Sequence, residues 1–164
     1  MSEVVGPHQG RPLLVVGEPL EKARAAMVMI HGRGASAEDI LTLVPELNRP
    51  GFVYLAPQAA NNAWYPNSFL APLASNEPGL SSALAVIASI FERLAQAGIS
   101  PEHTILLGFS QGACLSLEYI ARNACLYGGV AGLSGGLIGP DGTPRDYQGS
   151  LASTPIFLGC SDID

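Results

Sequence analysis

Short apolar segments alternate with helical segments along this chain, and that alternation limits the fold more than any other feature of the sequence. The apolar segments read as buried strands: Ala25–Ile30, Phe52–Ala56, Thr104–Leu107, Gly129–Leu133 and Pro155–Gly159. Strands that alternate with helices form a parallel sheet, because parallel neighbours need a long crossover connection. Residues 4–17 supply an edge strand or hairpin. We therefore predict one α/β domain over residues 1–164, with a mostly parallel sheet flanked by helices.

Three segments between these strands carry helical patterns. Ser36 precedes Asp39 by three residues, the spacing of a capping box, and this predicts a helix over roughly 37–48. From Leu80 to Gly98 apolar residues recur at every third or fourth position, which predicts a second helix. Gln111–Asn123 is a third, strongly apolar helix. Residues 57–79 form a long loop, and loops of this length usually carry function.

Composition excludes several classes of protein. The chain has 164 residues, 48% of them apolar and 13% charged, so it is not disordered. Its formal charge is −6 and it has no cluster of Lys or Arg, which argues against a nucleic-acid partner. We find no secretory signal and no stretch long enough to span a membrane.

The three cysteines indicate a reducing compartment. Their odd number and their spacing fit neither a zinc site nor a disulfide framework. Cys114 and Cys160 lie within apolar runs, so we expect both to be buried as small hydrophobic residues. Free thiols and the lack of a signal indicate the cytoplasm.

The main chemical motif is the Gly-Phe-Ser-Gln-Gly segment around Ser110. A buried strand runs into it and an apolar helix follows, which is the context that a nucleophile elbow requires. The turn in such an elbow is so sharp that the flanking positions must lack bulk, which Gly108 and Gly112 satisfy. We interpret Ser110 as a nucleophile rather than as a helix-capping serine in a glycine-rich turn.

An esterase also needs donors for the oxyanion that forms during acyl transfer. The backbone N–H of Gln111 is one candidate, because it follows the nucleophile at the start of a helix. The second should come from the loop after an earlier strand, and the Arg33 N–H within His31-Gly32-Arg33-Gly34 is the natural candidate. We expect His31 to position this loop and not to act as a base.

The catalytic acid should follow the serine in a loop beyond a later strand. Asp162 and Asp164 both lie just past Pro155–Gly159, and either could orient a histidine and stabilise its imidazolium.

At this point the residues resemble a known family. The chain is similar to the phospholipase/carboxylesterase family of bacterial α/β-hydrolases, which is related to acyl-protein thioesterases. The resemblance rests on segments spread through nearly the whole sequence: Met29-Ile30-His31-Gly32-Arg33-Gly34, Ala56-Pro57-Gln58, Trp64-Tyr65-Pro66, Gly108-Phe109-Ser110-Gln111-Gly112-Ala113, Leu133-Ser134-Gly135-Gly136-Leu137 and Gly159-x-x-Asp162. It implies the α/β-hydrolase fold and hydrolysis of carboxylic esters or thioesters by a Ser-Asp-His triad.

The resemblance also implies roles for individual residues. Ser110 becomes the nucleophile, and the Arg33 and Gln111 amides become the oxyanion hole. Both aspartates stay open as the acid, Asp162 by its spacing from Gly159 and Asp164 slightly preferred. Trp64 and Tyr65 would be walls of the acyl or alcohol pocket, although aromatic packing beneath a loop explains them equally well. No metal or other cofactor is implied.

The expected partner is a small-molecule ester, with a homodimer left open as the assembly. The family's histidine follows the acid, but His8, His31 and His103 all precede Ser110. We therefore expect residues 1–164 to be an incomplete domain without the last strand and helix, inactive alone because an unassisted serine is a weak nucleophile. In such a fragment Pro155–Gly159 would be an exposed apolar edge.

Two rival interpretations belong to other classes of protein. The first is a non-catalytic protein of hydrolase fold that binds a ligand in the same pocket. It gives no reason for an elbow and a glycine-rich oxyanion loop to occur together. The second is a structural α/β domain with an accidental motif, which leaves unexplained why the motifs gather at strand ends.

Overall fold

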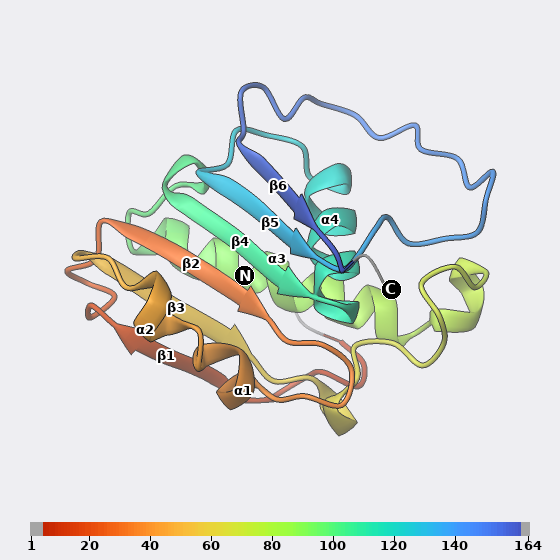
Figure 1. Cartoon of the computed structure of the whole chain (residues 1–164), viewed down its shortest axis with the longest axis horizontal. Helices are drawn as coiled ribbons and strands as arrows, with labels where there is room; N and C mark the ends of the chain where they lie inside the picture. The colour runs from red at the N-terminus through yellow and green to blue at the C-terminus, as the bar shows by residue number, and fades with distance from the viewer. Residues whose placement is uncertain (1–4, 162–164) are drawn as a thin grey trace.

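A six-stranded sheet runs through the protein (Figure 1). The computed structural model describes residues 5–161. The strands are β1 (Leu13–Gly17), β2 (Ala25–Ile30), β3 (Phe52–Pro57), β4 (Thr104–Phe109), β5 (Gly129–Leu133) and β6 (Ile156–Gly159). Their order across the sheet is β1-β3-β2-β4-β5-β6; β1 is antiparallel to β3 and every other pair is parallel. The predicted α/β-hydrolase fold with a mostly parallel sheet is confirmed.

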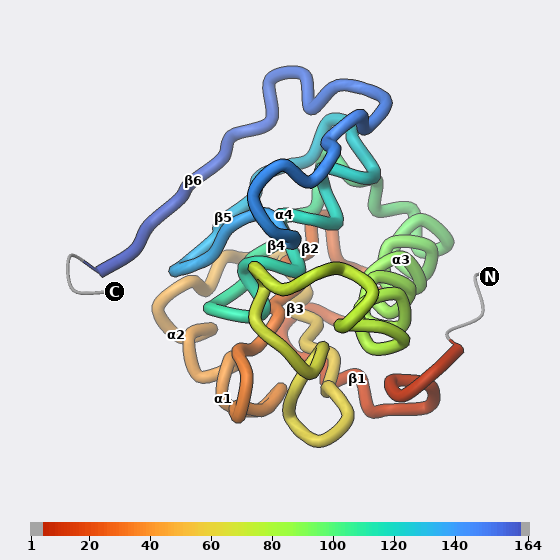
Figure 2. Tube along the Cα trace, turned by 90° about the vertical axis from the view of Figure 1, so that its right-hand side faces the viewer, coloured from red at the N-terminus to blue at the C-terminus, as the bar shows by residue number. Residues whose placement is uncertain are grey.

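Helices cover both faces of this sheet. Figure 2 shows α3 (Gly79–Gln96) on one side and the short helices α1 (Ala37–Leu41) and α2 (Val44–Leu47) on the other. The helix α4 (Gln111–Arg122) packs against β4 and β5 and lies beside α3. Three short 3-10 helices complete the described elements: Ala60–Asn62, Leu73–Asn76 and Pro101–His103.

The central strands are almost entirely apolar because both of their faces are covered; the buried Thr104 at the start of β4 is an exception. Side chains alternate between the faces of a strand. In β2, Val28 packs into the core under α3 and α4, whereas Met27 and Met29 pack into a second core with Ile40 of α1. Continuous apolar runs are therefore the expected signature of these buried parallel strands.

The predicted helix over 37–48 is wrong as a single helix. Its start is confirmed: the Ser36 hydroxyl accepts from the Asp39 N–H at 3.2 Å, and the Asp39 carboxylate accepts from the Ser36 N–H at 2.8 Å. The first helix then stops at Leu41, and α2 has Pro45 within its first turn. Proline has no N–H to donate to the preceding turn, so a continuous helix loses a hydrogen bond there.

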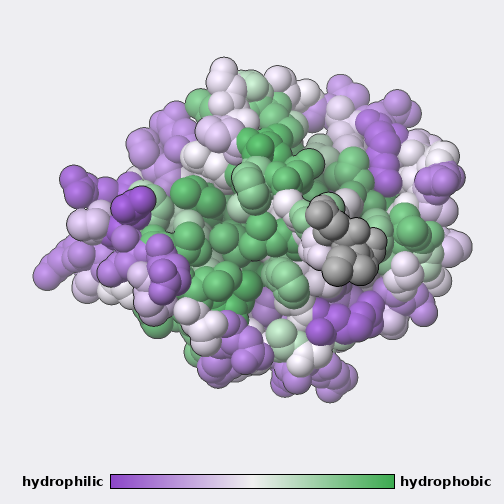
Figure 3. Space-filling view, in the orientation of Figure 1, coloured by the Kyte–Doolittle hydropathy of each residue, from purple (hydrophilic) through white to green (hydrophobic). Residues whose placement is uncertain are grey.

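The edge at β6 is apolar and exposed, as the sequence predicted. Phe157 and Leu158 are each 62% exposed, and within the described residues β6 pairs with β5 alone. Figure 3 shows hydrophobic side chains across the middle of the face that also carries α1 and α2. Cys114 is buried as expected, but the prediction for Cys160 is wrong, because it follows this edge strand and is exposed. No helix among residues 5–161 has the length and apolar character needed to cross a membrane.

Candidate active site

The site lies where the parallel strands end. The arrowheads of β2, β4, β5 and β6 all meet at one edge of the sheet (Figure 1). Arg33 follows β2, Ser110 follows β4, Ser134 follows β5 and Cys160 follows β6. In open α/β sheets this edge is where ligands bind.

Ser110 occupies a strained turn between β4 and α4. Its backbone has φ 52° and ψ −117°, a conformation that residues with a Cβ rarely adopt. The Ser110 N–H donates to the Leu133 carbonyl at 2.8 Å, and the Cys114 N–H donates to the Ser110 carbonyl at 3.1 Å. These bonds fix the serine between the end of β5 and the first turn of α4.

The two glycines of the elbow are required by close backbone contacts. A Cβ at Gly108 would lie 2.2 Å from the Gly112 carbonyl oxygen, and a Cβ at Gly112 would lie 2.2 Å from the Ile30 carbonyl oxygen. Gly32 is less tightly enclosed: a Cβ there would lie 3.2 Å from the Phe109 carbonyl oxygen and 3.4 Å from the Ser110 Cβ. The sharp turn and the tight packing of α4 on β2 and β4 therefore depend on these residues.

The loop after β2, which carries Arg33, is held in place by His31. The His31 ring is fully buried; its Nδ1 lies 2.8 Å from the Gly32 carbonyl, and its Nε2 accepts from the Ala59 N–H at 3.1 Å. Burial lowers the pKa of His31, which keeps the ring neutral and suits this pair of contacts. The expectation that His31 positions the loop is confirmed.

The side chain of Gln111 has a role that sequence reasoning missed. Its Oε1 accepts from the Trp64 N–H and its Nε2 donates to the Tyr65 carbonyl, both at 2.8 Å. Arg33 holds the next part of the same loop, because its guanidinium donates to the Pro66 carbonyl at 2.9 Å and to the Asn67 carbonyl at 2.7 Å. No local sequence signal points to these bonds, since the partners are more than thirty residues apart.

A cavity beside Ser110 has two lobes that share Phe69, Ser110 and Ser134. The small lobe, of about 240 Å³, is completed by Arg33, Tyr65, Ser68, Gln111 and Cys114. The large lobe, of about 510 Å³, is completed by Phe109, Gly135, Gly136 and Cys160. A substrate whose reacting atom sits at Ser110 can therefore extend in two directions.

Trp64 and Tyr65 have different positions relative to this cavity. Tyr65 lines the small lobe, whereas Trp64 is fully buried behind it and lines neither lobe. The Trp64 ring lies 5.2 Å from the His8 ring and 5.0 Å from the His31 ring, and its Nε1 donates to the His31 carbonyl at 2.9 Å. Trp64 therefore packs beneath the loop and Tyr65 lines the small lobe; that this lobe receives an acyl or alcohol group stays a prediction.

The hydroxyl of Tyr65 is buried and, among the described residues, has no hydrogen-bond partner of normal geometry. Burial, followed by the neighbouring Cys114, raises its pKa. Burial also raises the pKa of the Cys114 thiol. Both groups are therefore neutral near physiological pH. They contribute to the shape of the small lobe and add no charge to it.

Asp162 and Asp164, the two candidates for the acid, lie outside the described residues. The strand before them does reach the site. The Ser134 N–H donates to the Gly159 carbonyl at 2.6 Å, and Cys160 lines the large lobe. The segment after β6 thus leaves the sheet next to the large lobe.

The three histidines all lie within the described residues, and their contacts and positions can be compared with that of Ser110. Both ring nitrogens of His8 have partners, the Trp64 carbonyl at 2.8 Å and the Ala60 N–H at 3.0 Å, and both of His31 are used as described above. His103 precedes β4, so it lies at the far end of that strand, roughly 20 Å from the elbow at about 3.3 Å per residue.

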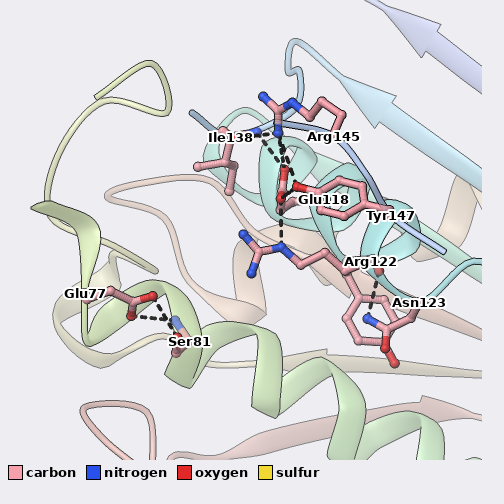
Figure 4. A network of polar contacts seen from close by, with 9 residues as sticks. Glu77, Ser81, Glu118, Arg122, Asn123, Ile138, Arg145 and Tyr147 are labelled. Atoms are coloured by element: carbon pink, nitrogen blue, oxygen red, sulfur yellow. Dashed lines mark hydrogen bonds and ion pairs between the residues drawn. The ribbon is translucent and has the colours of Figure 1, made fainter. Parts of the chain in front are cut away.

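The segment after β5 is fastened to α4 by a buried carboxylate (Figure 4). Glu118 is fully buried and accepts from Arg122 Nε at 2.8 Å, from Arg145 at 3.2 Å and from the Tyr147 hydroxyl. It also accepts from the Ile138 N–H at 2.9 Å. This network holds residues 138–147 against α4. The segment that it holds begins at Ser134, which lines both lobes.

Comparisons with known proteins agree with this geometry. The Phospholipase/Carboxylesterase family model matches residues 12–164. An acyl-protein thioesterase 1 from Kluyveromyces lactis is 30% identical over 167 residues, which cover 91% of this chain and 73% of that protein. The corresponding protein of Yarrowia lipolytica is 27% identical over 171 residues. The crystal structure of a phospholipase/carboxylesterase from Dyadobacter fermentans matches with a TM-score of 0.89 and 42% identity, over 94% of this chain and 74% of the other.

Proposed function

The chain belongs to the phospholipase/carboxylesterase family of hydrolases, and on that basis we propose that it cleaves carboxylic esters or thioesters of small or acyl substrates through an acyl-enzyme on Ser110. Thioesters are included because two of the relatives are acyl-protein thioesterases.

The reaction has two halves. In the first, the Ser110 Oγ forms a bond to the acyl carbon while a base takes the hydroxyl proton. The bond to the leaving alcohol or thiol then breaks, and the base returns the proton to that leaving group. In the second half a water molecule attacks the acyl-enzyme, the base takes the water's proton, and Ser110 leaves with that proton while the acid product is released.

The oxyanion in both halves is stabilised by the N–H groups of Arg33 and Gln111. Gln111 is the first residue of α4, and the first N–H groups of a helix have no acceptor within the helix. Gly32 brings the turn that carries Arg33 against Ser110. Loss of one such donor typically lowers kcat by about 10²–10³-fold.

The base is a histidine other than His8, His31 and His103, since His8 and His31 have other partners and His103 precedes β4. Asp162 or Asp164 orients that histidine, because both follow β6 where the chain leaves the sheet beside the large lobe. A cytoplasmic location and a homodimer stay predictions from the sequence.

The observation that carries the proposal is the backbone of Ser110, at φ 52° in a strand-to-helix turn that opens into both lobes. A non-catalytic protein has no reason to keep such strain at this residue.

The experiment uses the protein with its proposed base in place, here called the parent, and compares it with the Ser110→Ala variant. The parent should hydrolyse an aryl acetate and be labelled by a fluorophosphonate, and the variant should lose labelling and at least about 10³-fold in kcat. Ser134→Ala is the matched control, because Ser134 shares the cavity and also has a positive φ, of 58°. Labelling of Ser110→Ala at the parent's rate would place the nucleophile elsewhere.

A further inference from the structure

The small lobe holds one fixed positive charge. The Arg33 guanidinium is anchored by two backbone carbonyls, those of Pro66 and Asn67, and lies 6.0 Å from the centre of the Tyr65 ring. An anchored side chain loses little further conformational freedom when it binds a ligand. Arg33 is thus organised in advance at the mouth of a cavity that contains the nucleophile.

The anchoring bonds leave donors of this guanidinium unused. Arginine has five N–H donors, and the bonds to Pro66 and Asn67 occupy one on each terminal nitrogen. About three donors therefore remain for a ligand. Ser68 lines the same lobe, and its Oγ accepts from the Leu70 N–H at 3.2 Å, so its hydroxyl hydrogen is available as a further donor.

The charge of Arg33 is not neutralised by the described protein. None of the ion pairs within residues 5–161 includes Arg33, and no Asp or Glu is among the residues that line the small lobe. The aromatic rings of Tyr65 and Phe69 form part of the same walls. A site with a fixed cation, spare donors and no carboxylate of its own favours an anion.

We propose that the small lobe binds an acyl group with a terminal carboxylate, which the Arg33 guanidinium receives, so that the substrates are monoesters or thioesters of short dicarboxylic acids. This inference rests on the proposed Ser110 hydrolase and names its substrate class.

The acyl group is assigned to the small lobe by the strand that precedes the two proposed acids in the chain. The base must protonate the leaving group, so the leaving group lies on the side of the base and its acid partner. Both candidate acids follow β6, whose end reaches the large lobe at Cys160. The alcohol or thiol therefore lies in the large lobe and the acyl group in the small one.

The size of the small lobe fits a short chain. Its volume of about 240 Å³ equals roughly eight water molecules at about 30 Å³ each. A succinyl or glutaryl group has a comparable number of non-hydrogen atoms. A long fatty acyl chain would have to leave the lobe.

The test is the selectivity between two aryl esters of equal shape, the monosuccinate and the neutral 4-methylpentanoate. The ratio of their kcat/KM values should favour the succinate by at least about 10-fold in the parent. It should fall about 10-fold or more in Arg33→Gln and survive in part in Arg33→Lys. Because the carboxylate of an aryl succinate can attack its own ester, each rate is corrected with the Ser110→Ala variant.

Two controls make the result specific. Arg49→Gln changes the net charge equally, but Arg49 is exposed and precedes β3 at the opposite end of the sheet, so the ratio should stay at the parent value. An aryl acetate with a carboxylate on the aryl group carries its charge on the leaving group. Arg33→Gln should lower the kcat/KM of this ester no more than it lowers the kcat/KM of the neutral aryl acetate.

The outcomes are distinct. A ratio near one in the parent, or an equal loss for both esters in Arg33→Gln, overturns the inference and leaves Arg33 as a clamp on Pro66 and Asn67. Preference for the charge on the leaving side overturns the assignment of the small lobe to the acyl group. If Ser110→Ala hydrolyses the neutral ester as fast as the parent, the proposed function fails instead.

Discussion

The Oε1 atom of Gln111 accepts a hydrogen bond from the backbone N–H of Trp64 at 2.8 Å. This bond joins the residue after Ser110 to the long loop before α3. The same side chain donates to the Tyr65 carbonyl, so two buried backbone groups of the loop depend on one amide. Gln111 therefore links the first turn of α4 to the wall of the small lobe.

Gln111→Ala should keep the backbone N–H at this position but lower both stability and activity. It leaves a buried donor and a buried acceptor unpaired, and each costs about 1–3 kcal/mol. We expect a loss of about 2–4 kcal/mol in the free energy of unfolding, measured in urea, and a fall in kcat/KM of about 10-fold.

Gln111→Glu should be no better than the alanine variant near neutral pH, because a carboxylate cannot donate to the Tyr65 carbonyl. The exposed Gln96→Ala, at the end of α3, is the control and should change stability by less than about 0.5 kcal/mol. A fully stable Gln111→Ala would show that the loop is held by other contacts.

The sequence predicted the sheet well because strands buried on both faces are continuous apolar runs. Such runs can be recognised without knowing which residues they contact. The runs through Val28 and Leu106 are apolar apart from Thr104, and Gly108 and Gly112 mark the turn between a strand and a helix. The position of Ser110 followed from these local signals alone.

The contacts around the elbow could not be predicted in the same way. Glu118 and Arg122 are four residues apart in α4, a spacing that also describes an ordinary exposed pair. Only the fold brings Arg145 and Tyr147 to the same carboxylate and makes Glu118 a buried anchor. Trp64 likewise gives no sign in the sequence of whether it faces a ligand or the core.

Glu118→Gln should destabilise the protein by about 2–3 kcal/mol. Breaking a buried ion pair typically costs about 3–5 kcal/mol, and the value here is lower because water reaches part of both arginine partners. The amide keeps the volume of the carboxylate but leaves Arg122 and Arg145 without a counter-charge. Chemical denaturation of the two proteins measures the difference.

The matched control is Glu102→Gln. Glu102 faces His103 at 3.9 Å, with both side chains more than half exposed. Exposed pairs contribute about 0–1 kcal/mol, so this variant should stay close to the parent. Equal losses for the two substitutions would contradict the anchoring role of Glu118.

His8 and His31 should make the protein less stable in mild acid. Each ring accepts from an N–H at one nitrogen and lies against a carbonyl at the other, an arrangement that needs the neutral form. Burial lowers the pKa of both below the ordinary value of 6.5. The unfolded chain thus takes up protons first as the pH falls, and folding stability is full above 6.5 and declines below it.

Urea unfolding at about pH 7 and about pH 5.5 measures this decline, which has a limiting slope of about 1.4 kcal/mol per pH unit for each histidine. His8→Asn should reduce the slope. An unchanged slope in His8→Asn would rule out this ring as a source of the acid sensitivity.

Glycine at position 110 should be more stable than alanine, the reverse of the usual order. A residue with a Cβ at φ 52° and ψ −117° is strained by roughly 1–3 kcal/mol, and glycine is not. Ser110→Gly should therefore exceed Ser110→Ala by about 1 kcal/mol in the free energy of unfolding, while both variants lack the proposed nucleophile. The comparison at Ser89, inside α3, should have the opposite sign, because glycine in a helix interior costs about 1 kcal/mol relative to alanine. If glycine is the less stable residue at both positions, Ser110 stores no backbone strain, and the geometric argument for a nucleophile at this turn is lost.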